Sequence, residues 1–455
     1  MTSDAKRIVD ETSRSRAIVL VPILTRAGRP RGGPSSDISN TTTPTTQLHS
    51  PEDRLAETVG LAEAIAINVV EARLVPVPAP KPATLFGSGK VEELAELVQS
   101  LDGELVIIDH LLTPIQQRNL ERALKVKILD RTGLILEIFG ARARTREGRL
   151  QVELAHLSYQ KGRLVRAWTH LERQRGGAGF LGGPGEAQIE LDRRMIQERI
   201  NAIKKELAQV VRTRELHREG RRKVPYPIVA IVGYTNAGKS TLFNRLTGAG
   251  VLAQDQVFAT LDPTMRELRL SGGRRIILSD TVGFISDLPT MLVAAFRATL
   301  EEVIEADLIL HVRDISHHET EAQAFDVEKV LTELGIDASL EDAPLLEVWN
   351  KADLLDDETR DVTLLKAQRR KRSPVFVSAL TGEGVQELLG AIDERLGVGD
   401  EIRDVVLAGT DGSKLNWFYE NTEVLKRTDQ DDGRIILKVR IGQEKRGRLD
   451  AILAQ

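Results

Sequence analysis

The residues best suited to bind a phosphate form one short stretch in the middle of the chain. Gly233 and Gly238 stand five positions apart, and Lys239 and Ser240 follow at once. In this G-x-x-x-x-G-K-[ST] pattern, main-chain N–H groups converge on phosphates, the lysine reaches the outer phosphates and the hydroxyl binds Mg²⁺. We predict phosphate contacts from Gly233, Tyr234, Thr235, Asn236, Ala237, Gly238, Lys239 and Ser240.

The sequence on both sides of this stretch suits a P-loop. Ile228–Val232 is a continuous run of apolar, mostly β-branched residues, which is typical of a buried parallel strand. Thr241–Leu246 continues in helical register. A strand before and a helix after are the context that the motif requires. A partial glycine motif at Gly87–Lys90 lacks both the first glycine and the hydroxyl residue, so we interpret it as a turn into a helix.

A second group of candidates lies in two loops further along. Asp280 and Gly283 follow a predicted strand at Arg275–Ser279, and Thr260 precedes that strand. We predict Lys239, Thr260 and Gly283 to be catalytic, because they would bind the γ-phosphate and its metal. Magnesium would be held by Ser240 and Thr260, and by Asp280 through water, with Thr260 ordered only by a triphosphate. The other nucleotide-lining residues predicted here are Phe258, Ala259, Leu261, Asp262, Thr281 and Val282.

The base is expected to be selected at the end of another predicted strand, Leu345–Trp349. Asp353 can accept hydrogen bonds from N1–H and the exocyclic amine of guanine, donors that adenine does not present in that arrangement. The predicted base-binding residues are Asn350, Lys351, Ala352 and Asp353, with main-chain N–H groups from Ser378, Ala379 and Leu380. The sequence therefore predicts a GTP hydrolase rather than an ATPase.

The residue after Gly283 is Phe284, at the position where Ras-like enzymes orient the attacking water with glutamine. An apolar side chain cannot orient water, so we expect slow intrinsic hydrolysis that a large partner or a bound cation accelerates. Asn236 is a candidate ligand for K⁺. The alternative is that Asn236 only caps the loop.

Composition excludes several classes of protein. The chain has 455 residues, no cysteine and a formal net charge of -4, with 41% hydrophobic and 29% charged residues. Without cysteine there is no disulfide framework, thiol nucleophile or Cys-ligated zinc. No stretch approaches the roughly 20 apolar residues of a membrane span, and the start lacks the apolar core of a signal peptide. We expect a cytoplasmic protein, monomeric in solution, with loose membrane association left open.

The predicted fold class is α/β. An N-terminal α/β domain carries a coiled-coil helical hairpin, followed by a doubly wound, mainly parallel P-loop domain and a small C-terminal α+β region. The N-terminal domain is expected to have strands at 17–24, 71–77, 105–108 and 126–129, with helices at 61–67, 91–101 and 113–124. The predicted boundaries are 1–15 for a flexible N-terminus, 16–140 with a disordered insertion at 27–51, 141–223 for the hairpin, 224–397, and 398–455.

The hairpin prediction depends on two heptad series and on charge. Leu150, Leu157, Leu164 and Leu171 fall seven apart, as do Ile189, Ile196, Ile203 and Val210, with a glycine-rich tip at 175–185 between the series. Residues 141–223 contain 20 basic and 10 acidic residues, whereas 224–400 contain 17 basic and 29 acidic ones. A basic helical arm favours binding to a phosphate backbone. The alternative is a pair of solvated coiled-coil flanks.

The C-terminal region contains two strand-like segments. Arg403–Ala408 is one, and Arg434–Arg440, which alternates apolar and polar residues, is the other; Leu415–Tyr419 is a short apolar stretch between them. Basic side chains of Arg434–Arg440 could touch RNA. We favour a solvated edge strand.

Several motifs together resemble the HflX-type GTPases of the Obg–HflX superfamily. The similarity extends over roughly Ser50 to Leu396. It includes the P-loop, Phe258–Thr264 and Asp280–Ile285, and also segments outside them: Gln116–Glu121, Leu129–Thr132, Ile138–Ala143, Gly148–Ala155, Gly183–Glu186 and Asp192–Arg194. Phe284 is then the hydrophobic substitution that this superfamily typically shows.

The resemblance implies a GTPase that binds the 50S subunit or 70S ribosome and splits or rescues ribosomes under stress. Its arm is expected to face 23S rRNA near the peptidyl-transferase region, with candidate RNA contacts at Arg173, Arg175, Gly183, Pro184 and Gly185. The tip departs from the family pattern, which usually has an arginine directly before Gly-Pro-Gly-Glu. The insertion at 27–51 is also unusual.

Two other functions are compatible with parts of the sequence. A regulatory GTPase switch could use the hairpin to dock a protein partner, such as a protease complex at the membrane. An ATP-using RNA-remodelling enzyme is disfavoured by Asp353.

Overall fold

The computed structural model describes residues 15–24, 48–174, 184–222, 226–248, 258, 264–271, 273–289, 292, 297–338, 340, 343–370, 372–397, 400–408, 410–430, 433–441 and 446–453. Their contacts define two units. The first contains residues 1–205 together with 256–261 and 287–296, and the second contains the remaining segments. No helix among these residues is long and apolar enough to cross a membrane.

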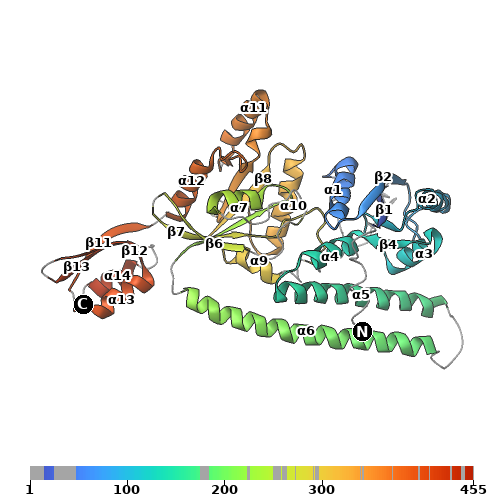
Figure 1. Ribbon diagram of the computed structural model, residues 1–455, viewed down its shortest axis with the longest axis horizontal. Coiled ribbons are helices and arrows are strands. Elements are labelled where there is room, and N and C mark those ends of the chain that lie inside the picture. The colour runs from blue at the N-terminus through green and yellow to red at the C-terminus, as the bar shows by residue number, and fades with distance from the viewer. Residues whose placement is uncertain are drawn as a thin grey trace, which may run out of the picture. The chain divides into compact units, whose positions relative to one another are not determined.

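A four-stranded parallel sheet forms the centre of the first unit (Figure 1). Its strands are β1 (Arg16–Leu24), β2 (Asn68–Val77), β3 (Leu105–Ile108) and β4 (Lys127–Asp130), in the order β2-β1-β3-β4. Strands β1 and β3 are buried over most of their length, as expected for parallel strands with helices on both faces. The predicted α/β alternation is confirmed, with strand ends shifted by a few residues.

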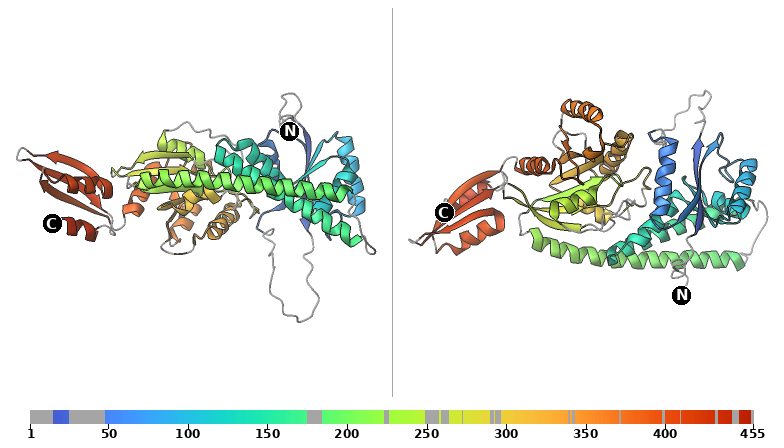
Figure 2. Two further views of the ribbon diagram at one scale, coloured as in Figure 1. Left: turned by 90° about the horizontal axis from the view of Figure 1, so that it is seen from below. Right: turned by 45° about the horizontal axis from the view of Figure 1, so that its top comes forward.

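Helices α2 (Ser88–Ser100) and α3 (Pro114–Leu124) lie side by side on this sheet (Figure 2). Helix α1 (Pro51–Glu63) differs from the prediction, which placed a helix at 61–67. The Ser50 side chain accepts a hydrogen bond from the Asp53 N–H, and Pro51 occupies the first turn, so the helix begins ten residues earlier. It ends before Ala66, whose φ is 60°.

Helix α4 (Arg131–Arg142) was not predicted, because no turn separates it from β4. Asp130 is both the last residue of the strand and the cap of the helix, since its carboxylate accepts a hydrogen bond from the Gly133 N–H at 2.8 Å. The helix is largely apolar and mostly buried.

The two heptad series form α5 (Arg146–Gln174) and α6 (Pro184–Arg222). Within the first unit, Glu153 on α5 accepts two hydrogen bonds from Arg199 on α6, at 2.7 and 2.9 Å. The heptad residues Leu150 and Ile203 are buried. The structure does not describe the tip at 175–183. It also does not describe the side chains of 164–189 or most of the α6 side chains beyond Val210.

The second unit contains a six-stranded sheet in the order β10-β9-β8-β5-β7-β6. All neighbouring strands are parallel except β6 and β7. The strands are β5 (Ile228–Gly233), β6 (Thr264–Arg269), β7 (Arg275–Asp280), β8 (Leu308–Asp314), β9 (Leu345–Asn350) and β10 (Val375–Phe376). This is the predicted doubly wound P-loop fold, with β5 buried at its centre from Val229 onward.

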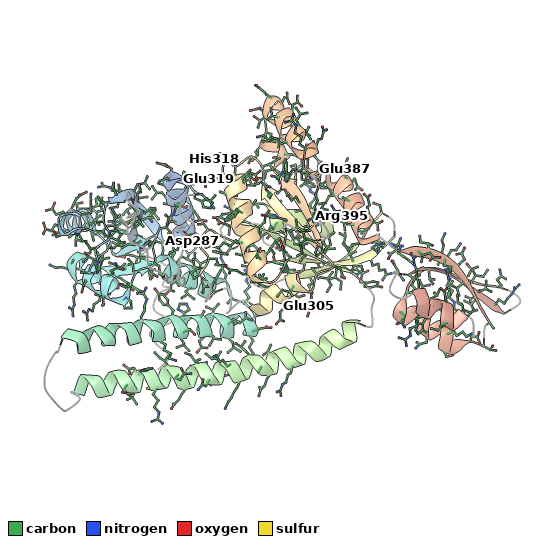
Figure 3. The ribbon with its side chains drawn as sticks, turned by 180° about the vertical axis from the view of Figure 1, so that it is seen from behind. Asp287, Glu305, His318, Glu319, Glu387 and Arg395 are labelled. Carbon is green, nitrogen blue, oxygen red and sulfur yellow. The ribbon has the colours of Figure 1, made fainter. Side chains whose placement is uncertain are left out.

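Helices cover both faces of this sheet. Helices α7 (Lys239–Thr247) and α12 (Val385–Gly397) share one apolar core with the strands, while α9 (Arg297–Ile304) and α10 (Thr320–Glu333) pack against β5. Helix α11 (Asp357–Gln368) precedes β10. On α12, Glu387 lies in the first turn and Arg395 in the last (Figure 3), which favourably complements the helix dipole.

A smaller antiparallel sheet follows, in the order β11-β13-β12. Its elements are β11 (Glu401–Ala408), α13 (Gly412–Asn421), β12 (Glu423–Asp429), β13 (Arg434–Ile441) and α14 (Arg446–Leu453). Strand β13 is the central strand, so the edge-strand interpretation of Arg434–Arg440 is wrong. Its alternation instead reflects one face packed on α13 and α14, with Leu437 and Val439 fully buried.

Candidate functional site

The phosphate-binding stretch follows β5 directly, and its shape requires glycine. Gly233 ends the strand, and Gly238 precedes α7 with a φ of 90°. A Cβ at Gly238 would lie 2.2 Å from the Asn350 Nδ2 atom. Any side chain here would therefore both strain the backbone and displace Asn350.

Lys239 is the first residue of α7, so the main-chain N–H groups of its turn have no partners within the helix and can bind an anion. The Lys239 Nζ donates a hydrogen bond to the Tyr234 carbonyl at 2.7 Å. Burial lowers the pKa of Lys239 to about 8, and the nearby Asp280 carboxylate opposes that shift. A buried amine that is mostly charged near neutrality suits phosphate binding.

A candidate metal-binding pair lies beside the lysine. Ser240 Oγ donates a hydrogen bond to a carboxylate oxygen of Asp280 at 2.8 Å. Asp280 ends β7 and is fully buried. A hydroxyl and a carboxylate at this spacing are hard oxygen ligands of the kind that Mg²⁺ prefers. The two residues fit a site in which Ser240 binds the ion directly and Asp280 binds one of its waters.

The chain after Asp280 is fixed against the phosphate loop. The Phe284 N–H donates to the Gly233 carbonyl at 3.1 Å, and the Thr235 N–H donates to the Phe284 carbonyl at 2.7 Å. The Tyr234 hydroxyl accepts from the Ser286 N–H at 2.8 Å. These contacts hold Phe284 with its side chain fully buried.

Gly283 lies in close contact with the same loop. A Cβ at Gly283 would stand 2.9 Å from Thr235 Cγ2 and 3.0 Å from Lys239 Nζ. A side chain at this position would therefore crowd both Thr235 and the lysine. The buried Thr281 hydroxyl donates a hydrogen bond to the Ile231 carbonyl in β5. This side chain therefore stabilises the sheet and does not face a nucleotide. Val282 is also buried.

Among the predicted base-binding residues, Asn350 contacts Ala379 directly. Its Nδ2 donates to the Ala237 carbonyl at 2.8 Å, and its Oδ1 accepts from the Ala379 N–H at 2.9 Å. One side chain therefore connects the phosphate loop to the loop at 378–380. Lys351 pairs with Asp314 at 2.7 Å, and Asp353 lies half-buried in the short helix η2 (Ala352–Leu354).

Arg245 completes this arrangement and was missed from the sequence. From α7 its Nε donates to the Ala379 carbonyl at 3.1 Å, and its Nη2 donates to the Leu380 carbonyl. The residues are more than 130 positions apart, so no local signal could have joined them.

Asn236 lies at the exposed rim of the loop with a φ of 59°. Its side chain forms no hydrogen bond with any residue that the structure describes. The side chain is therefore available to a ligand. No described contact supports the alternative that Asn236 only caps the loop.

Several predicted residues are not brought to this site by the described structure. Thr260, Ala259, Leu261 and Asp262 lie outside the described residues. Phe258 is described, but its contacts group it with the first unit, where its ring meets Phe139 edge-on at a centroid distance of 4.7 Å.

The candidate RNA contacts are also incompletely described. Arg173 lies near the end of α5, with its side chain outside the description, and Pro184 and Gly185 begin α6. Arg175 and Gly183 lie outside the described residues.

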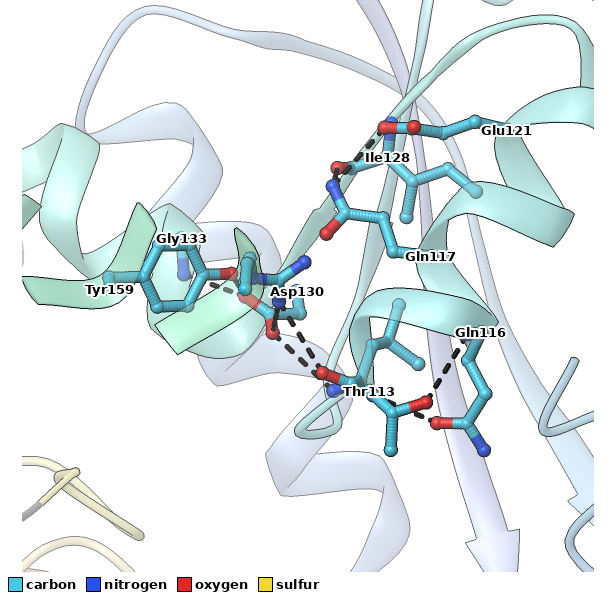
Figure 4. A network of polar contacts seen from close by, with 10 residues as sticks. Thr113, Gln116, Gln117, Glu121, Ile128, Asp130, Gly133 and Tyr159 are labelled. Atoms are coloured by element: carbon cyan, nitrogen blue, oxygen red, sulfur yellow. Dashed lines mark hydrogen bonds and ion pairs between the residues drawn. The ribbon is translucent and has the colours of Figure 1, made fainter. Parts of the chain in front are cut away.

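In the first unit, Asp130 fixes the arm to the sheet (Figure 4). Besides capping α4, it accepts hydrogen bonds from the Tyr159 hydroxyl at 2.5 Å and from Arg163, both on α5. Burial, followed by the Asp130 charge, raises the pKa of Tyr159 far above its ordinary value, so the phenol stays protonated. The middle of α5 is thereby bonded to the end of β4.

The doubly wound sheet, the glycine-bounded phosphate loop and the Ser240–Asp280 pair define a P-loop GTPase. Four family models match the chain: a GTP-binding GTPase N-terminal region at residues 52–140, the middle region at 142–221, a 50S ribosome-binding GTPase at 228–351 and the HflX C-terminal domain at 363–455. The chain belongs to the HflX family of GTPases.

Relatives in this family match nearly the full length. A GTPase HflX from Magnetococcus marinus is 52% identical, covering 83% of this chain and 86% of the relative. The GTPase HflX of Escherichia coli is 44% identical, covering 87% and 91%. A GTP-binding protein from Sulfolobus solfataricus, solved with GDP, is 23% identical over 84% of this chain and 99% of that one, with a TM-score of 0.42.

Proposed function

We propose that this GTPase binds GTP and Mg²⁺ through the residues assembled around α7. The phosphates lie on the loop of Gly233–Ser240, with Lys239 on the outer phosphates and the Gly283 N–H toward the γ-phosphate. Mg²⁺ is bound by Ser240, by Asp280 through water, and by Thr260 in the triphosphate state. The Ser240–Asp280 hydrogen bond is the single observation that carries this assignment.

Base selection is assigned to the loops that Asn350 connects. Asp353 accepts the two donors of guanine, and main-chain N–H groups of the 378–380 loop face O6. Because Asn350 contacts both the phosphate loop and Ala379, base and phosphate binding are coupled.

We propose slow intrinsic hydrolysis that the partner accelerates. Phe284 is buried and offers no group that could orient water. K⁺ at Asn236 is the candidate source of additional positive charge in the transition state. Measuring the GTPase rate in K⁺ and in Na⁺ tests this role, and we expect the rate to be higher in K⁺. Equal rates would show that K⁺ does not take part in hydrolysis.

The proposed partner is the large ribosomal subunit, and two independent observations support it. The matching family model is described as a 50S ribosome-binding GTPase. Helix α6 also presents exposed cations, including Arg193, Lys204, Lys205 and Arg212. Such a basic helix binds a phosphate backbone with salt-dependent affinity.

In this proposal the triphosphate form binds the large subunit through the arm, splits or rescues the ribosome, and leaves after hydrolysis. Sedimentation of 70S particles through sucrose with the protein and a non-hydrolysable GTP analogue tests the outcome. We expect conversion to free subunits with the analogue and none with GDP. Intact 70S particles that retain the bound protein would refute splitting.

We also propose a cytoplasmic location.

The second candidate is a switch that docks a protein through the arm. It is favoured by Leu191 and Met195, apolar side chains of α6 that are 50% and 54% exposed. Changing Leu191 and Met195 to Ser should then abolish partner binding, whereas changing Lys204 and Lys205 to Gln should not. The ribosome proposal predicts the reverse.

A further inference from the structure

Arg245 contacts the predicted base-binding loop at 378–380. The proposed phosphate site gives it no role. Arg245 lies in the last turn of α7 and is exposed at its surface. Its guanidinium nevertheless bonds to two consecutive carbonyls, Ala379 and Leu380. It also covers Gly382, because a Cβ there would lie 3.8 Å from its Cζ atom.

The bond to Ala379 has a consequence for the next residue. The Ala379 carbonyl and the Leu380 N–H belong to one planar trans peptide, so they point in opposite directions. A donor fixed on the carbonyl therefore fixes the direction of the N–H as well. A charged donor on the carbonyl also polarises the peptide and makes its N–H a stronger donor.

The Leu380 N–H has no acceptor among the residues that the structure describes, whereas the Ala379 N–H is already bonded to Asn350 Oδ1. The Leu380 side chain is 70% exposed, so the residue is not held by packing. The orientation of this peptide depends on the contacts at its carbonyl.

We infer that Arg245 is a positioning residue for guanine recognition, which orients and polarises the Leu380 N–H as the donor to O6 of the base. This inference rests on the proposed guanine site. Helix α7 would then have two roles: its first turn binds the phosphates, and its last turn orients the loop that binds the base.

The test measures binding of three diphosphates to the full chain by titration calorimetry. GDP presents O6, N1–H and the amine; IDP lacks only the amine; 6-thio-GDP keeps both donors but replaces O6 by sulfur, a weaker acceptor. We expect Arg245→Gln to weaken GDP and IDP about tenfold, the value of one hydrogen bond to a strengthened donor, and 6-thio-GDP less than threefold. Arg245→Lys, which keeps the charge but not the planar fork, should lie between.

The matched control is Arg360→Gln. Arg360 pairs with Glu383, three residues beyond the 378–380 loop, but bonds to neither carbonyl, and both side chains are partly exposed. We expect all three affinities to stay within about twofold of the wild type, as for a surface ion pair. Melting temperatures of the unliganded variants show whether the fold is retained.

Each outcome decides the inference. Equal weakening of all three ligands by Arg245→Gln would mean that the arginine only stabilises the loop, and would overturn it, as would no weakening at all. Wild-type protein that binds GDP and 6-thio-GDP equally would instead overturn the underlying assignment of the 378–380 loop to O6.

Discussion

Ser240 Oγ donates a 2.8 Å hydrogen bond to the Asp280 carboxylate, which joins the start of α7 to the end of β7 across 40 positions of the chain. The two oxygens that we propose as Mg²⁺ ligands therefore lie within hydrogen-bond distance of each other before any ion enters. A preorganised pair of this kind lowers the cost of assembling a Mg²⁺ site.

Asp280→Asn tests the metal assignment. The amide keeps the shape of the side chain but loses its charge, so affinity for Mg²⁺ should fall about 10–100-fold. Release of bound GDP should then become almost insensitive to EDTA, whereas in the wild type EDTA should accelerate it strongly. Stopped-flow release of a fluorescent GDP measures both. Equal EDTA sensitivity of the two proteins would remove Asp280 from the metal site.

The buried amine of Lys239 predicts how nucleotide binding depends on pH. Its pKa is about 8 in the free protein because burial disfavours the charge, and bound phosphates must raise it. Binding should therefore take up a proton above pH 8, and affinity should fall as pH rises through that value. Calorimetry at pH 8.5 in buffers of different ionisation enthalpy measures the uptake. Lys239→Arg, which stays charged, should show none.

Asp353→Asn should change the preferred base. The amide can accept from N1–H but donates where guanine also donates, so GDP should bind about a hundredfold more weakly and xanthosine diphosphate more tightly. Asp357→Asn, on an exposed residue of the first turn of α11, is the matched control and should alter neither affinity. A variant that still prefers GDP would contradict the role of Asp353.

The Asp130 network predicts how firmly the arm is held. Asp130→Ala removes the acceptor for Tyr159 and Arg163 and leaves a partly buried charge unpaired, at a cost of about 3–5 kcal/mol. Tyr159→Phe removes one hydrogen bond and should cost only about 1 kcal/mol. Denaturant unfolding with a probe on α5 measures both. Equal losses of stability in the two variants would mean that Asp130 contributes no more than its hydrogen bond to Tyr159.

His311 predicts a loss of stability in acid. It lies in β8, and its two buried ring nitrogens have no hydrogen-bond partner among the residues that the structure describes. Burial lowers its pKa to about 4, with Arg313 adding to the effect. The unfolded chain takes up this proton near pH 6.5 and the folded chain does not. The contribution of His311 is therefore complete above pH 6.5 and falls as pH drops toward 4, by about 3 kcal/mol in all.

His311→Leu removes that titration. The melting temperature of the variant should fall less than that of the wild type between pH 7.5 and pH 5. Parallel losses would show that other groups account for the acid sensitivity.

The parts of the fold that the sequence predicted are those with local signals. The phosphate loop, the strand before it and the helix after it are contiguous, so Gly233–Ser240 could be located from spacing alone. The same holds for Thr113, whose capping box with Gln116 starts α3 where it was expected.

The parts that were missed or wrong depend on distant contacts. The place of β13 in its sheet depends on pairing with both β11 and β12, which alternation along one strand cannot reveal. The start of helix α4 has only the Asp130 cap as a signal, and the same residue also ends a strand, so no turn marks the boundary. Arg245 acquires its role only because α7 and the 378–380 loop meet in the folded protein.

In the proposed mechanism, the bound nucleotide controls binding of the basic arm to the large ribosomal subunit. Co-sedimentation of the protein with purified 50S subunits, loaded in parallel with GDP and with a non-hydrolysable GTP analogue, tests it most directly. The account predicts affinity at least about tenfold higher in the triphosphate form, a difference of about 1.4 kcal/mol, and weaker binding of both forms as salt is raised. Equal affinity of the two forms would contradict it.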